Sequence, residues 1–103
     1  MSDTITPQEL AEREGQVVID VRTPDEYAEE HVPGAMDVPL EQLGQRSGEL
    51  PDAEQLVLIC ASGHRSAQGA ALLNERGIPA VSVEGGLTAW KDAGYAVEGG
   101  RPA

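Results

Sequence analysis

The chain alternates short apolar runs with longer polar segments. Apolar and β-branched residues dominate positions 17–21, 55–60 and 80–83, and a shorter run lies at 36–38. Runs of this length without a regular polar alternation are typical of strands that are covered on both faces in a parallel sheet. We therefore predict strands at these four positions, and we expect the most apolar run, residues 55–60, to lie centrally.

Two helix starts share one pattern. Residues 6–9 and 23–26 each offer a threonine that can cap a helix, a proline at the first helical position, and a glutamate three residues after the threonine. This pattern predicts a capping box, in which the threonine and glutamate side chains accept hydrogen bonds from each other's backbone N–H groups. One helix is thus expected before the strand at 17–21 and another after it.

A longer helix is predicted over residues 66–76, directly after the central strand. Gly77 is expected to end this helix, because glycine is the common residue just past a helix C-terminus. Ala67, Ala70 and Ala71 would give it a face of small residues that can lie close to a sheet. A polar stretch at 41–46 is also expected to be helical.

The last strand is followed by a Gly85-Gly86 turn and a short helix over 87–92 that carries Trp90, which we assign to packing. Strands that alternate with helices indicate an α/β fold with a mainly parallel sheet. A chain of 103 residues is long enough for one such domain and hardly for two. We expect a single α/β domain with a mainly parallel central sheet of about five strands, flanked by helices.

The charge is strongly acidic, with 18 Asp and Glu against 7 Lys and Arg and a net charge of −11. Residues 1–54 hold 14 acidic and 3 basic residues, whereas residues 55–103 hold 4 of each. Binding to nucleic acid needs clustered cations, so nucleic acid is not expected as a partner. We interpret the acidic surface as a solvated face that favours solubility, with adaptation to high salt and docking on a basic partner as alternatives.

Cysteine use and hydropathy indicate a cytoplasmic protein that does not enter a membrane. With Cys60 as its one cysteine, the chain forms no internal disulfide, and a free thiol suits a reducing compartment. Residues 1–6 lack the positive and apolar regions of a signal peptide, and the longest apolar run, 56–61, is far shorter than a membrane span. One cysteine and two histidines give no metal-ligand spacing, so neither a metal nor a cofactor is expected.

The best candidate for chemistry is the segment that follows the central strand, Cys60-Ala61-Ser62-Gly63-His64-Arg65-Ser66. Ligands of parallel α/β folds collect at the carboxyl ends of the strands. A short loop that runs into a helix N-terminus can point several backbone N–H groups inward and bind an anion, with support from the helix dipole. Gly63 can adopt the positive φ that tight curvature requires, and Arg65 adds a planar cation suited to an oxyanion.

Such surroundings would activate the thiol of Cys60. An ordinary cysteine, with a pKa of ~8.5, is only a few per cent thiolate at neutral pH, whereas helix N-termini and nearby cations lower this pKa to ~3.5–7.5. A nucleophile would then exist without a dedicated general base. The alternative is a small buried hydrophobic residue at a strand end. The neighbouring Gly63, Arg65 and helix start favour the functional interpretation.

This segment resembles the active-site loop of single-domain rhodaneses. Further blocks resemble the family in the same order and spacing: Asp20-Val21-Arg22, Tyr27, His31-Val32-Pro33-Gly34-Ala35, and Gly85-Gly86 with residues 87–90. The resemblance covers about residues 4–95, so residues 1–103 are expected to form one rhodanese-like domain.

The resemblance implies a thiosulfate sulfurtransferase. Cys60 would attack the outer sulfur of a donor such as thiosulfate, release sulfite, and hold the sulfur as a persulfide that cyanide or a cellular thiol removes. Donor binding would fall to the rest of the loop: Ala61, Ser62, Gly63, His64, Arg65 and Ser66. Asp20 and Arg22 would support the loop, although a structural ion pair explains them equally well. His64 is expected to face solvent, and His31 to be structural.

Two other functions stay open. A rhodanese-like domain can serve a dedicated protein partner as a sulfur carrier or as a regulatory binding module, which an intact Cys60 does not exclude. Cysteine-based phosphatases and related arsenate reductases also combine a cysteine, an anion-binding loop and an arginine, but with five residues between the two side chains. Here four residues, 61–64, separate Cys60 from Arg65, and the tighter loop is less able to surround a phosphate monoester.

Overall fold

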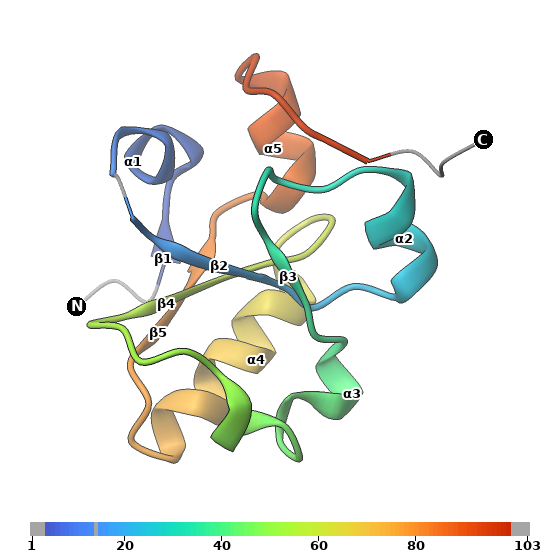
Figure 1. Ribbon diagram of the computed structural model, residues 1–103. Coiled ribbons are helices and arrows are strands. Elements are labelled where there is room, and N and C mark those ends of the chain that lie inside the picture. The colour runs from blue at the N-terminus through green and yellow to red at the C-terminus, as the bar shows by residue number, and fades with distance from the viewer. Residues whose placement is uncertain (1–3, 14, 100–103) are drawn as a thin grey trace.

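A five-stranded parallel sheet forms the centre of the protein (Figure 1). The computed structural model describes residues 4–13 and 15–99. The sheet order is β1-β5-β4-β2-β3, and all its strand pairs are parallel. The strands are β1 (Thr4–Ile5), β2 (Val17–Asp20), β3 (Met36–Asp37), β4 (Leu56–Ile59) and β5 (Ala80–Val83). The expected α/β class, the parallel sheet and the central place of β4 are confirmed.

The edge strand β1 was not predicted from the sequence. Its two residues pair with Ser82 and Val83 of β5. Two residues are too few to show any hydrophobic period, so this strand exists because β5 offers it a free edge.

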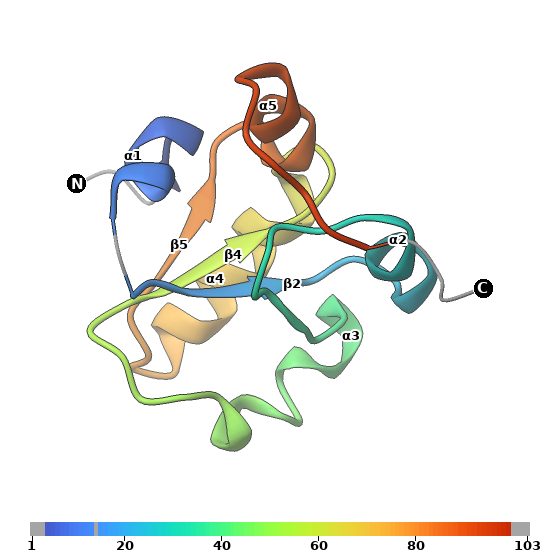
Figure 2. The same cartoon turned by 45° about the horizontal axis from the view of Figure 1, so that its top comes forward.

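Helices cover both faces of the sheet (Figures 1 and 2). They are α1 (Pro7–Glu12), α2 (Pro24–Glu29), α3 (Leu40–Leu43), α4 (His64–Glu75) and α5 (Gly86–Asp92), with a 3₁₀ turn η1 (Ser47–Glu49). One apolar core joins the sheet to α1 and α5 through Leu10, Leu87 and Trp90. The other joins it to α3 and α4 through Leu43 and Leu73. None of the helices in the described part of the chain is long and apolar enough to cross a membrane.

Both predicted capping boxes are present. The Glu9 N–H donates to Thr6 Oγ1 at 3.1 Å and the Thr6 N–H to Glu9 Oε1 at 3.0 Å. At the start of α2 the same two bonds join Glu26 and Thr23, each at 3.2 Å. The cap at α2 fixes the Glu26 side chain, which matters for the site described below.

Helix α4 begins at His64, two residues before the predicted start. Gly63 caps it with a φ of +105°, and this left-handed turn brings the chain from strand to helix sooner than the polar composition of the loop indicated. The prediction for its packed face was wrong in part: Ala67 and Ala71 are exposed, and Ala70 is buried. Gly69 makes the close approach instead, since a Cβ there would lie 2.7 Å from Leu58 Cδ2.

The winding of the chain reverses between β2 and β4. From β2 the chain moves outward to β3, whereas from β4 it moves outward to β5 on the other side. The loops that follow β2 and β4 therefore leave toward opposite faces. A pocket lined in part by Val21, Arg22, Thr23 and Arg65 lies at the carboxyl ends of these strands. The candidate loop, residues 60–66, starts at this position.

Candidate active site

Cys60 lies at the end of β4, in the core that α3 and α4 cover, and only 1% of its surface is exposed. Its sulfur is surrounded by hydrogen-bond donors of the loop that follows. The Gly63 N–H lies 3.1 Å and the Ser66 N–H 3.3 Å from Sγ, and the Ser66 hydroxyl lies 3.4 Å from it. We call residues 60–66 the cysteine loop. It forms the inward-pointing cradle of N–H groups that its sequence predicted.

The Gly85-Gly86 turn supports this loop from behind. The Leu87 N–H donates to the Cys60 carbonyl at 2.8 Å, and the Thr88 N–H to the Ala61 carbonyl at 3.1 Å. Gly86 has a φ of +61°, and a Cβ on it would overlap both carbonyls, within 2.6 Å of the Ala61 oxygen. The first turn of α5 thus holds the backbone of Cys60 in place.

The pKa of Cys60 is lowered, in the predicted direction. Burial raises the pKa, because a thiolate is poorly solvated there. The hydrogen bonds from the Ser66 hydroxyl and from the N–H groups of Ser66, Gly63 and Ser62 outweigh burial and lower it. The inward-pointing N–H groups of the loop thus contribute to the lowered pKa as expected. In the described part of the chain the hydrogen bonds to Sγ come from backbone N–H groups of the cysteine loop and from the Ser66 hydroxyl, and none comes from the Arg65 guanidinium.

Arg65 lies in the first turn of α4, but its guanidinium is engaged elsewhere. Nη1 lies 2.8 Å from Glu26 Oε1 and Nη2 3.1 Å from Glu26 Oε2, so the pair is bidentate. The arginine lowers the pKa of Glu26 to about 2, and the carboxylate raises the pKa of Arg65. This ion pair joins the helices that follow β2 and β4. Sequence reasoning missed Glu26, whose place in a capping box was the one signal it offered.

The hydroxyl of Ser66 contacts a second buried serine, Ser82. Ser66 is fully buried and its hydroxyl lies 2.6 Å from that of Ser82, which is 2% exposed and comes from β5. The Ser66 hydroxyl also lies 3.3 Å from the Gly63 carbonyl. A Ser82 hydroxyl that donates to Ser66 leaves the Ser66 proton free to point at Cys60, which suits a thiolate there.

Asp20 and Arg22 form a buried ion pair. Arg22 Nε lies 3.0 Å and Nη2 2.8 Å from the Asp20 carboxylate, and the Arg22 N–H donates to it as well. Arg22 Nη2 also donates to the Glu30 carbonyl at 2.6 Å. These contacts occupy both side chains, so the geometry favours the structural interpretation. The pair lies at the end of β2, beside β4, and ties the β2–α2 turn to the end of α2.

His64, His31 and Trp90 lie as expected, the first facing solvent and the other two in structural contacts. His64 is exposed, as are Ser62 and, in part, Ala61. The His31 ring stacks on Tyr27 with centroids 3.8 Å apart, and its Nδ1 lies 2.7 Å from the Tyr27 carbonyl. Trp90 is buried and donates to the Ala96 carbonyl at 2.9 Å. His31 and Trp90 therefore serve structure.

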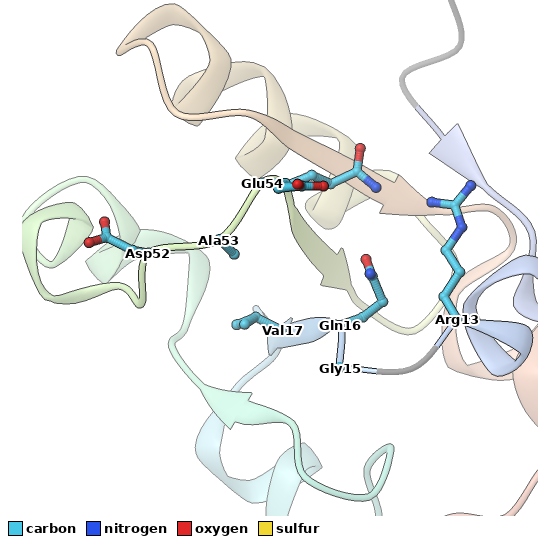
Figure 3. A pocket seen from close by; sticks show the side chains of 8 residues that line it. Arg13, Gly15, Gln16, Val17, Asp52, Ala53 and Glu54 are labelled. Atoms are coloured by element: carbon cyan, nitrogen blue, oxygen red, sulfur yellow. The ribbon is translucent and has the colours of Figure 1, made fainter.

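A hollow of about 700 Å³ opens at the opposite end of the sheet, where the segments before β2 and β4 approach each other. Figure 3 shows Arg13, Gln16 and Glu54 around it, with Asp52 set apart from them. Its lining holds no cysteine, serine or histidine. Since Cys60 follows the carboxyl end of β4, this hollow is separate from the cysteine loop.

The rhodanese-like domain family matches this chain over residues 6–93. Since the match covers most of its length, the chain belongs to the rhodanese-like domain family. A crystal structure of a rhodanese-related protein from Thermoplasma volcanium superposes with a TM-score of 0.87 at 31% identity, covering 92% of this chain and 96% of that one.

Two curated relatives of this chain are named as sulfurtransferases. A sulfurtransferase from Allochromatium vinosum is 35% identical over 91 residues, which cover 87% of this chain and 85% of that protein. Thiosulfate sulfurtransferase PspE from Escherichia coli is 39% identical over 71 residues, 67% of this chain and 68% of that protein. Other relatives are longer, and the chain spans about half of their length. The comparisons support a rhodanese-like sulfurtransferase family, at a level of identity that leaves donor and acceptor open.

Proposed function

We propose that this protein transfers sulfane sulfur from a donor such as thiosulfate to a thiophilic acceptor, through a persulfide on Cys60. The observation that carries the proposal is the ring of donors around Sγ, from the N–H groups of Gly63 and Ser66 and the Ser66 hydroxyl. These donors favour an anion at this position, either the attacking thiolate or the terminal sulfur of a persulfide.

In the first half-reaction the Cys60 thiolate attacks the outer sulfur of thiosulfate. The new S–S bond forms as the bond to the sulfonate sulfur breaks, and the electron pair of that bond leaves with sulfite. Cysteine thiolate and thiosulfate thereby become cysteine persulfide and sulfite, without an external oxidant. In the second half-reaction, cyanide or a thiolate attacks the terminal sulfur and leaves as thiocyanate or a new persulfide, which restores the thiolate.

The burial of Cys60 limits what can react there. With 1% of the residue exposed, the sulfur is reached by a small terminal atom and not by a bulky group. The outer sulfur of thiosulfate meets this requirement. Cys60 is the one cysteine of the chain, so a persulfide cannot be resolved internally and the sulfur must pass to another molecule.

We assign donor binding to residues 61–66 of the cysteine loop, with the backbone N–H groups as the main contacts. Asp20 and Arg22 keep a supporting role through the β2–α2 turn. No step of this scheme needs a metal or a cofactor.

The test is steady-state turnover with thiosulfate and cyanide. We expect thiocyanate and sulfite in equal amounts, ping-pong kinetics, and no activity in Cys60→Ser, with negligible hydrolysis of aryl phosphates. Hydrolysis of aryl phosphates through Cys60 without thiocyanate formation would replace this proposal by a phosphatase. A protein that takes up sulfur but releases it to neither cyanide nor small thiols would be a carrier for a protein partner.

A further inference from the structure

The ion pair between Arg65 and Glu26 has consequences for the choice of donor. Arg65 is the one arginine or lysine within the cysteine loop, and its two terminal nitrogens are the groups that would hold the oxygens of an anionic donor. Both nitrogens already donate to the Glu26 carboxylate, at 2.8 and 3.1 Å. A donor that binds Arg65 end-on, through both terminal nitrogens as Glu26 does, must displace this carboxylate.

Glu26 is held where it is even without the arginine. Its Oε1 accepts hydrogen bonds from the N–H and the hydroxyl of Thr23, at 3.2 and 3.1 Å, as the third residue of the α2 capping box. When an anion draws Arg65 away, the Glu26 carboxylate thus stays beside the site. Arg65 is the largest cause of the lowered pKa of Glu26, but even an ordinary glutamate, with a pKa of about 4.3, is charged near neutral pH.

The pair is nevertheless separable. The two side chains are 37% and 34% exposed, and ion pairs at such positions contribute little net stability, because water solvates the separated partners well. The ion pair is therefore weak enough to compete with a ligand, whereas the buried pair of Arg22 and Asp20, at 6% and 1% exposure, is not.

We propose that Glu26 is a specificity-determining residue, which occupies Arg65 and so disfavours dianionic sulfur donors relative to donors of low charge. This inference rests on the proposed sulfur transfer and names its substrate class. A dianion such as thiosulfate loses the Arg65 contact and meets a fixed negative charge. With a persulfide of a small thiol that carries no charged group, the Cys60 thiolate attacks the terminal sulfur, the S–S bond of the donor breaks, and the small thiolate leaves with its electron pair. This step needs neither Arg65 nor the removal of Glu26, so such persulfides are the donor class that the site favours.

The binding of an anion, measured without turnover, tests whether Glu26 keeps Arg65 from the donor. In the Cys60→Ser background, the affinity for thiosulfate is measured by calorimetry with Glu26 intact and with Glu26→Gln. Glutamine can keep the capping box, and it removes the charge. We expect thiosulfate to bind about ten- to a hundredfold more tightly to the Glu26→Gln protein, the range of a recovered charge-assisted hydrogen bond.

The chain offers a matched control for this substitution. Glu9 holds the same capping-box position in α1 and also has an arginine partner, Arg13, at 3.7 Å. Glu9→Gln therefore removes the same charge from the same kind of site, and it should leave the affinity for thiosulfate unchanged. Adding Arg65→Ala to the Glu26→Gln protein should abolish the gain, and thermal unfolding of each variant checks that it is folded.

Equal or weaker binding of thiosulfate in Glu26→Gln would overturn the inference, as would a gain that persists in Arg65→Ala. A second readout keeps the inference apart from the proposed function. In the proteins that retain Cys60, the transfer of sulfur to this cysteine is followed with two donors. One is thiosulfate and the other is the persulfide of a small thiol that carries no charged group. Glu26→Gln should speed loading from thiosulfate and leave loading from the persulfide unchanged. Loading from neither donor would refute sulfur transfer, while the calorimetry would still decide whether Glu26 masks Arg65.

Discussion

The Gly85-Gly86 turn permits a sharp test of how the cysteine loop is held. Gly86→Ala places a Cβ against the Cys60 and Ala61 carbonyls, within 2.6 Å of the latter, where real Cβ contacts stay beyond 3.0 Å. These neighbours are backbone atoms, so the loop itself must move, by about half an ångström or more. The change also puts alanine at a φ of +61°, at a cost of roughly 1–2 kcal/mol in unfolding free energy.

Gly77→Ala separates these two effects. Gly77 has a φ of +79°, but a Cβ there meets nothing within 4 Å. Its alanine variant should lose only the conformational cost, roughly 1–2 kcal/mol, and keep its activity. Gly86→Ala should lose more stability, and its rate of thiocyanate formation should fall by up to about a hundredfold, the effect that a displacement of about 1 Å would have on a reacting group.

The assays are urea unfolding and thiosulfate–cyanide turnover, on both variants under conditions in which each is folded. A Gly86→Ala protein that retains the rate of Gly77→Ala would refute the reasoning, because the loop would then tolerate displacement of its supporting backbone. If Gly86→Ala does not fold, Gly85→Ala provides the test: its φ is +74° and its Cβ would press on Ala89 rather than on the loop. That variant should lose stability and retain turnover, whereas loss of turnover in its folded form would contradict a specific role for Gly86.

Three further predictions follow from the contacts. Ser66→Ala should raise the pKa of Cys60, because the Ser66 hydroxyl is one of the groups that lower it. Alkylation of the thiol at pH 6 should slow about tenfold, the effect of losing one hydrogen bond to a charged group. An unchanged dependence of alkylation on pH would contradict this. Asp20→Asn should cost about 3–5 kcal/mol in urea unfolding, because Arg22 is left buried without its counter-ion, and a cost below 1 kcal/mol would show that the pair is dispensable. The pKa of Glu26 is lowered from 4.5 to about 2, so its ionised form contributes stability above pH 4.5 that is lost as the pH falls toward 2. The free energy of unfolding of Glu26→Gln should therefore decline less steeply over this pH range than that of the unchanged protein. Parallel curves would contradict the ion pair in solution.

Features set by local rules were predictable from the sequence. The capping boxes depend on residues three positions apart, and the left-handed turn at Gly63 on a single glycine, so both could be identified without the fold. The start of α4 and its packed face were harder, because alanines do not fix the phase of a helix. Gly69 carried an unused signal: glycine inside a helix is unfavourable by about 1 kcal/mol and therefore indicates a close approach.

The parts of the site that could not be predicted depend on which elements are neighbours. Ser82 meets Ser66 because β5 lies beside β4, and Gly86 meets Cys60 for the same reason. Glu26 reaches Arg65 because the chain reverses its winding between β2 and β4. Arg65 was predicted to bind an anionic donor and to help activate the thiol, and the sequence offered no means of seeing that a carboxylate 39 positions away would pair with it.

The most direct test of the account is the mass of the protein after exposure to a sulfur donor. Incubated with excess thiosulfate and then freed of small molecules, the protein should gain the mass of one sulfur atom, and fragmentation should place that atom on Cys60. Cyanide should remove the added mass and yield an equal amount of thiocyanate, while Cys60→Ser should show neither change. A protein that gains no sulfur from thiosulfate or from a neutral persulfide, or that carries it on a residue other than Cys60, would contradict the claim that this loop is built to hold a persulfide.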